Sequence, residues 1–113
     1  MNPQQSDYCL VFVSAPSIAK AKEIATTLVE TRLAACVAIA EIDSIDVWDG
    51  KINCDRKWQL QIKTKSDLFS QISIKIKSIH PDEVPEIIAV PITSGSQSYL
   101  DSIEERVKQL DRD

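Results

Sequence analysis

The only histidine of the chain lies beside three carboxylates and two prolines in residues 80–87, which read HPDEVPEI. Proline fixes its own φ angle and disfavours helical geometry in the residue before it, so this stretch predicts a stiff turn between a helix and a strand. A stiff acidic turn suits ligand capture or subunit docking. A rigid crossover with solvated acids is the plainer interpretation, and the residue types alone leave both open.

A metal site is the chemistry that these residue types suggest, with Cys36, His80, Glu83 and Glu86 as its candidate ligands. Thiolate and imidazole favour copper or zinc over magnesium or calcium. Structural zinc takes four protein ligands and catalytic zinc three, so Cys36 and His80 need carboxylates, water or a second subunit to complete a site.

Each of these residues also has an interpretation without a metal. Cys36 is flanked by alanine and valine and suits a buried packing thiol. His80 suits a polar cap on a helix. The two glutamates, Glu83 and Glu86, suit solvated charges or surface partners of Arg32.

Composition narrows the classes of function. The chain has 113 residues, 43% of them hydrophobic, with only two glycines and a net charge of −4. This favours one globular domain over residues 1–113, with residues 1–6 flexible, and gives no basic stripe for nucleic acid or an anionic membrane. The longest apolar run, Leu33–Ala40, is too short to span a bilayer, and the first residues do not resemble a secretion signal, so a cytoplasmic location is expected.

The three cysteines, Cys9, Cys36 and Cys54, are odd in number and widely spaced. They form no pattern of a disulfide framework or a zinc finger. We expect each to be a small buried hydrophobic residue.

Hydrophobic periodicity predicts four strands and three helices. The expected strands are Tyr8–Val13, Ala34–Val47, Ile52–Thr64 and Glu86–Ile92, and the helices run from Ser17 to about Arg32, from Ser66 to Ile79 and, after Ser94–Ser96, through Leu100–Leu110. Alternation slips at Ala40–Ile42, which predicts a β-bulge there. Asp49 and Gly50 predict a two-residue hairpin turn.

The element order is βαββαβ with a terminal helix, which predicts an α+β, ferredoxin-like sandwich with an over-long central hairpin. Hairpin arms of roughly thirteen residues extend about 40 Å. A compact chain of this length has a diameter of only roughly 34 Å. Exposed strand ends of this kind are prone to aggregation, so a closed homo-oligomer is expected to cover them.

Several collinear motifs resemble the CutA divalent-cation-tolerance proteins. They are RLAACV at 32–37, WDGKI at 48–52, IKT at 62–64, HP at 80–81 with EVPEI at 83–87, PI at 91–92 and YL at 99–100. The match runs in order from about Cys9 to Val107. The resemblance implies a ferredoxin-like homotrimer with a role in tolerance of copper and other divalent metals, and an architecture similar to the trimeric P-II signalling proteins.

Four positions depart from the family pattern. Asp46 and Asp82 stand where tyrosine is common, Lys57 where the family has an acidic residue, and Ser102 where tryptophan is common. Lys57 matters most for metal, because an ammonium group cannot ligate and repels a nearby cation.

The functional hypothesis is a non-enzymatic, cytoplasmic homotrimer that binds copper or another divalent metal weakly, without an organic cofactor. A P-II-like sensor of a small molecule, or an anchoring scaffold without metal, is the alternative. An acylphosphatase-like enzyme is disfavoured because residues 14–17 contain no arginine or glycine, and a hydrolase because no G-x-S-x-G motif is present.

Overall fold

The computed structural model describes residues 6–110, so most of the segment expected to be flexible, residues 1–5, lies outside the described residues together with 111–113. Four strands form one antiparallel sheet in the order β2-β3-β1-β4. The strands are β1 (Tyr8–Ala15), β2 (Cys36–Trp48), β3 (Lys51–Lys65) and β4 (Ile87–Pro91), and the helices are α1 (Ile18–Glu30), α2 (Phe69–Ile79, after the turn Ser66–Leu68) and α3 (Gln97–Arg106). This confirms the predicted α+β fold.

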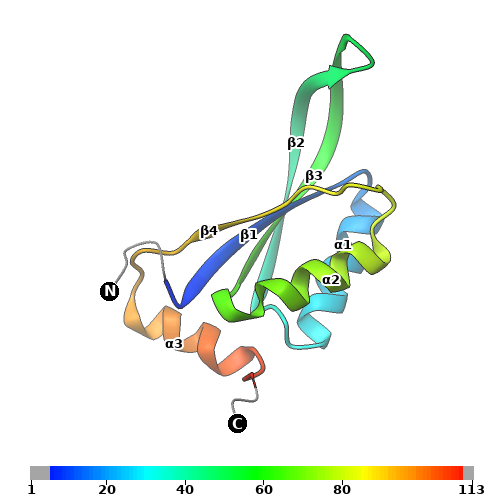
Figure 1. Ribbon diagram of the computed structural model, residues 1–113. Coiled ribbons are helices and arrows are strands. Elements are labelled where there is room, and N and C mark those ends of the chain that lie inside the picture. The colour runs from blue at the N-terminus through cyan, green and yellow to red at the C-terminus, as the bar shows by residue number, and fades with distance from the viewer. Residues whose placement is uncertain (1–5, 111–113) are drawn as a thin grey trace.

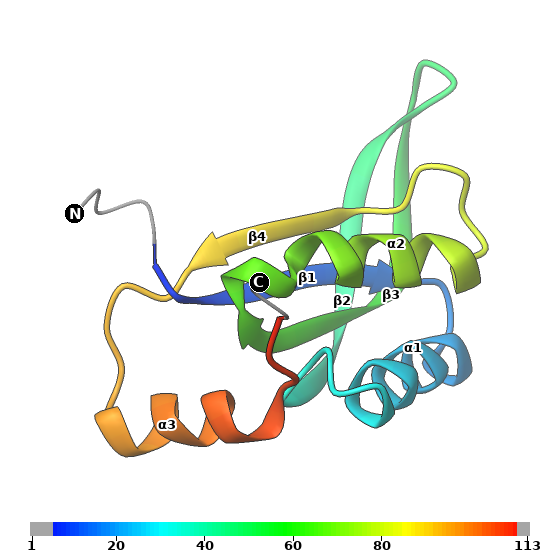
Figure 2. The same cartoon turned by 60° about the horizontal axis from the view of Figure 1, so that its bottom comes forward.

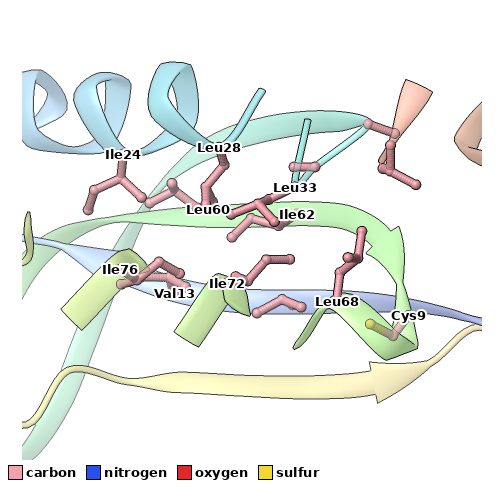
Figure 3. Packing of buried hydrophobic residues seen from close by; sticks show 14 of the residues in the cluster. Cys9, Val13, Ile24, Leu28, Leu33, Leu60, Ile62, Leu68, Ile72 and Ile76 are labelled. Carbon is pink, nitrogen blue, oxygen red and sulfur yellow. The ribbon is translucent and has the colours of Figure 1, made fainter. Parts of the chain in front are cut away.

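Helices α1 and α2 cover one face of the sheet (Figure 1). Alternate residues of β1, beginning with Cys9, are buried beneath these helices. Ile24 and Leu28 of α1 lie over Leu60 and Ile62 of β3 (Figure 3). Since burying a side chain of this size contributes about 1.5–3 kcal/mol, these contacts hold the helices on the sheet.

Local signals fix the ends of α1 and α2. The Ser17 side chain accepts a hydrogen bond from the Lys20 backbone N–H and caps the start of α1. Helix α2 ends at Ile79, where Pro81 favours the extended conformation that His80 adopts, with φ −80° and ψ 138°. The point at which the loop after α2 begins is therefore set by its own sequence.

Strands β2 and β3 continue well beyond the sheet. Strand β3 pairs with β1 only up to Trp58, so within residues 6–110 the pairs from Ile42 with Lys57 to Trp48 with Lys51 have no further strand beside them. We call residues 42–57 the arm, and it projects clear of the helices (Figure 1). Asp49 and Gly50 form its turn with φ angles of 53° and 74°, which confirms the predicted two-residue turn.

Two expectations are wrong. The pairing of β2 with β3 is uninterrupted from Cys36 to Trp48, so no bulge occurs at Ala40–Ile42. The alternation slips there because the strand leaves the helices and no longer has one face against the core. Cys54 is exposed on the arm, whereas Cys9 is buried and Cys36 is half-buried.

In the described part of the chain, none of the helices has both the length and the apolar character that crossing a bilayer requires.

Candidate functional site

A cleft of about 820 Å³ separates the arm from the loop that follows α2. One wall is a single face of the arm, and the other is the start of the loop. The lining residues are Asp46, Trp48, Asn53, Asp55 and Lys57 from the arm and Pro81, Asp82, Glu83 and Val84 from the loop. Figure 2 shows the loop beside the base of the arm.

The charges of the cleft are unequal. Four carboxylates line it, from Asp46, Asp55, Asp82 and Glu83, against the single ammonium group of Lys57. The acidic side chains outnumber the basic one among the described lining residues, so the electrostatic potential of the cleft attracts cations. The positive charge of Lys57 weakens that attraction. The indole of Trp48 is 75% exposed and adds an aromatic surface at the distal end.

Three of the four positions expected to depart from the family pattern meet in this cleft. Asp46, Lys57 and Asp82 all line it, although they come from two strands and a loop. The fourth, Ser102, is on α3, where its hydroxyl donates to the Tyr99 carbonyl at 2.6 Å. Three of these positions therefore lie together, and the fourth lies elsewhere.

His80 is buried against the end of β1, with only 9% of its surface exposed. Its backbone N–H donates to the Ile76 carbonyl at 2.8 Å and so caps α2. In the ring, Nε2 lies 2.8 Å from the Ser14 carbonyl oxygen, and Nδ1 accepts a hydrogen bond from the Asp82 N–H at 3.0 Å. His80 is thus the last capping residue of α2 through its backbone, whereas its ring bonds to β1 and to the loop with both nitrogens engaged.

Cys36 lies far from this histidine within one chain. It pairs with Lys63, which pairs with Leu10, whereas His80 contacts Ser14. Four residues along a strand correspond to about 13 Å, in addition to the spacing between strands. Val37, next to Cys36, packs on the core, so the Cys36 side chain points to the sheet face that α1 and α2 leave uncovered.

The two glutamates are exposed and differ in position. Glu83 lines the cleft, whereas Glu86 precedes β4 and is not part of the lining. Neither pairs with Arg32, whose guanidinium donates to the carbonyls of Glu105 and Arg106, so that suggested partner is wrong. Among residues 6–110, no group of three or more His, Cys, Asp or Glu side chains is placed to hold a metal ion.

A second polar cavity, of about 560 Å³, was missed by the sequence analysis. Lys65 donates to Glu104 at 2.8 Å inside it, and the hydrogen bonds from Lys65 and Gln109 lower the pKa of the Glu104 carboxyl. The same bond raises the pKa of Lys65, and partial burial followed by the nearby Glu104 charge raises the pKa of Tyr8. The residues that line this cavity come from segments far apart in the sequence, so no local spacing of residue types predicts it.

Comparison with known proteins identifies the family. The family model described as "CutA1 divalent ion tolerance protein" matches residues 9–106, and the chain belongs to this family. It is 38% identical over 98 residues to the "Divalent-cation tolerance protein CutA" of Archaeoglobus fulgidus, a match that covers 87% of this chain and 96% of that one. It is 47% identical over 90 residues to "Protein CutA" of Mus musculus, covering 79% of this chain and 51% of the mouse protein.

Solved structures agree with the fold. The Archaeoglobus fulgidus protein superposes with a TM-score of 0.87 at 37% identity, covering 89% of this chain and 99% of that one. CutA1 from Oryza sativa superposes with a TM-score of 0.90 at 31% identity, covering 95% and 99%. The archaeal protein is described as periplasmic and an Arabidopsis thaliana relative as chloroplastic, so relatives occupy different compartments and the cytoplasmic location stays a prediction.

Proposed function

We propose that this protein is a homotrimer that binds divalent transition-metal ions weakly and non-enzymatically in the cleft between the arm and the loop. The observation that carries the proposal is the acidic lining of that cleft: its four carboxylates draw cations to it, although no three of them are placed to hold an ion without water or a second copy. Membership of a family described by divalent ion tolerance supports the choice of ligand.

The predicted set of Cys36, His80, Glu83 and Glu86 does not fit a metal within one chain. Only Glu83 lines the cleft, His80 has both ring nitrogens engaged, and Cys36 lies on the uncovered sheet face. A complete coordination sphere therefore requires water or groups from a second copy. Under the Irving–Williams order, copper is expected to bind more tightly than zinc.

The trimer is supported by apolar surface that one chain leaves uncovered. Leu10 and Phe12 of β1 alternate with residues buried beneath the helices and are only half-buried. Ile88 and Val90 of β4 pair with them and are exposed. An exposed apolar surface of this kind marks an interface, and a second copy is the partner proposed here.

Titration calorimetry with Cu²⁺ tests the metal proposal. Lys57→Glu removes the cation of the cleft and is expected to strengthen copper affinity by about 1 kcal/mol, roughly fivefold. Lys108→Glu is the matched control, because it makes the same charge change beyond α3, near Arg32 and away from the cleft.

An equal effect of the two substitutions places binding outside the cleft and contradicts the proposal. If titration of Cu²⁺ into the wild-type protein gives no more heat than titration into buffer, the protein does not bind the metal and the proposal is contradicted.

A P-II-like sensor of a small molecule is the second candidate. The cleft volume of about 820 Å³ favours it, since small-molecule sites span about 300–1,000 Å³. Calorimetric titration with nucleotides separates the two, because a metal site of this kind gives no heat with a nucleotide in the absence of divalent ions.

A further inference from the structure

We infer that His80 is a positioning residue, which fixes the loop wall of the cleft through both ring nitrogens, and that its imidazole is not a metal ligand. This rests on the proposed function in taking the cleft as the binding site. The inference about the ring itself depends only on the geometry of His80 and its neighbours.

The hydrogen bonds define one protonation form of the ring. A nitrogen that accepts a hydrogen bond carries no proton, so Nδ1, which accepts from the Asp82 N–H, is bare. The proton of the neutral ring is then on Nε2, which donates to the Ser14 carbonyl oxygen at 2.8 Å. The ring joins the loop to β1 by one bond on each side.

The loop depends on this connection. In the part of the chain that the structure describes, residues 81–84 make no hydrogen bond or ion pair other than the one from Asp82 to the ring. All four residues are exposed, and Val84 is among the most exposed apolar residues. Pro81 has no N–H to donate. The position of Asp82 and Glu83 in the cleft wall is therefore set mainly by His80.

A metal ion on the ring is incompatible with this arrangement. Coordination at Nε2 replaces the bond to Ser14, and coordination at Nδ1 replaces the bond from Asp82. Either one releases the loop that carries the carboxylates of Asp82 and Glu83. The imidazole can fix the wall or bind metal, and the structure shows it fixing the wall.

The first test is nitrogen NMR of the imidazole in the wild-type protein. His80 is the single histidine, so its ring gives one unambiguous pair of ¹⁵N signals. We expect the signals to show a protonated Nε2 and an unprotonated Nδ1. Both signals are expected to stay unchanged as Zn²⁺ is titrated to saturation. A proton on Nδ1, or a change of either ring signal on zinc binding, overturns the inference.

The second test compares three substitutions. His80→Asn places an amide oxygen near the position of Nδ1, His80→Gln places an amide nitrogen near that of Nε2, and His80→Ala keeps neither. Hydrogen exchange at the Asp82 amide is expected to accelerate roughly fivefold in His80→Ala, the loss of about one hydrogen bond, and to be restored by His80→Asn.

Zinc affinity in the same variants separates positioning from ligation. Positioning predicts that zinc binding weakens in His80→Ala and recovers in His80→Asn. Equal loss in all three variants, with the Asp82 amide still protected in His80→Asn, shows a ligand and overturns the inference. If wild type binds no zinc, the proposed function fails, and the NMR signals and Asp82 exchange still decide the role of the ring. A variant that does not fold leaves the wild-type NMR test intact.

Discussion

Arg32 holds a backbone conformation that residues other than glycine seldom adopt, with φ of 60°. It follows α1 as part of a Schellman motif, in which the Arg32 N–H donates to the Val29 carbonyl and the Leu33 N–H to the Leu28 carbonyl. Glycine is usual at this position. Arginine is used here because its side chain donates to the carbonyls of Glu105 and Arg106 and so caps α3 from α1.

The two contributions of Arg32 can be separated by substitution. Arg32→Ala keeps the backbone strain and loses the capping bonds, and we expect it to lower the free energy of unfolding by about 1–2 kcal/mol. Arg32→Gly loses the same bonds but relieves the strain, so it is expected to be about 1 kcal/mol more stable than Arg32→Ala. Urea denaturation at one protein concentration measures both. Arg32→Gly proving the less stable variant refutes this account.

Glu104 gives stability a dependence on pH. Its pKa is lowered from the ordinary 4.5 by the bonds from Lys65 and Gln109, so the stabilisation is complete above that value and is lost as pH falls through the lowered pKa. The raised pKa of Lys65 keeps that side chain charged up to and beyond 10.5. The pair therefore contributes between about pH 4.5 and 10.5, and by less than about 1 kcal/mol because it is partly exposed.

Glu104→Gln is expected to be less stable than wild type at pH 7, with the difference shrinking as pH falls below 4.5 and through the lowered pKa of Glu104. Unfolding free energies measured from pH 3 to pH 8 test this. Glu105→Gln is the control, because its side chain makes no hydrogen bond among the described residues. If the difference in unfolding free energy between wild type and Glu104→Gln stays constant down to pH 3, the contribution of the bond from Lys65 does not depend on the Glu104 charge.

Among the elements of the fold, the two-residue turn of the arm is the one whose geometry is most directly set by its own residues. Asp49 and Gly50 both have positive φ, as a type I′ turn requires, and a Cβ added at Gly50 meets nothing within 4 Å. Gly50→Ala therefore costs only backbone strain, about 1 kcal/mol. Asp49→Asn is expected to be neutral or slightly stabilising, because asparagine adopts this conformation readily.

Thermal unfolding of the two variants tests the turn. Gly95→Ala is a useful contrast, since its added Cβ lies 3.2 Å from the Leu100 side chain and φ is not positive there. A Gly50→Ala protein as stable as wild type contradicts the assignment of strain to the turn.

The sequence predicted the elements that have a core or a turn to define them. The alternation of Leu60, Ile62 and Thr64 in β3 reflects real burial under α1 and α2, so the predicted strand was correct. The bulge at Ala40–Ile42 was wrong because residues beyond Ala40 leave the core, and periodicity there no longer reports on a buried face. Helix α3 was placed by Ser96, which caps it, but it ends at Arg106, before the predicted Leu110.

The site was only partly accessible from sequence. Pro81 correctly placed an acidic turn after α2. The neighbour of that turn is an arm more than 20 residues earlier in the chain, and its approach depends on the direction in which the arm projects. The partner that fixes His80 is the backbone carbonyl of Ser14, which has no sequence signature because every residue carries one.

At the scale of the whole molecule, the arm makes the chain elongated. Its extents are 47 × 29 × 26 Å and its radius of gyration is 15.0 Å, against about 13 Å for a compact chain of this length. One face of the arm is apolar, with Ile45, Val47, Ile52 and Cys54 in line. None of the other described residues covers this face, which is the physical reason for expecting further copies to cover it.

The two faces of the arm differ in polarity, which allows a test of whether the chains associate through the arm. Light scattering of wild type is expected to give the mass of three chains, and Ile52→Lys to reduce it on dilution. Ile52 is 76% exposed in one chain, so a charge there leaves the isolated fold intact and acts only on contacts between chains. Losing a buried isoleucine costs about 1.5–3 kcal/mol for each arm. Asn53→Lys places the same charge on the next residue, which lies on the opposite face, and is expected to keep the wild-type mass. A wild-type monomer at micromolar concentration, or equal dissociation of the two variants, shows that the apolar face of the arm does not join the chains.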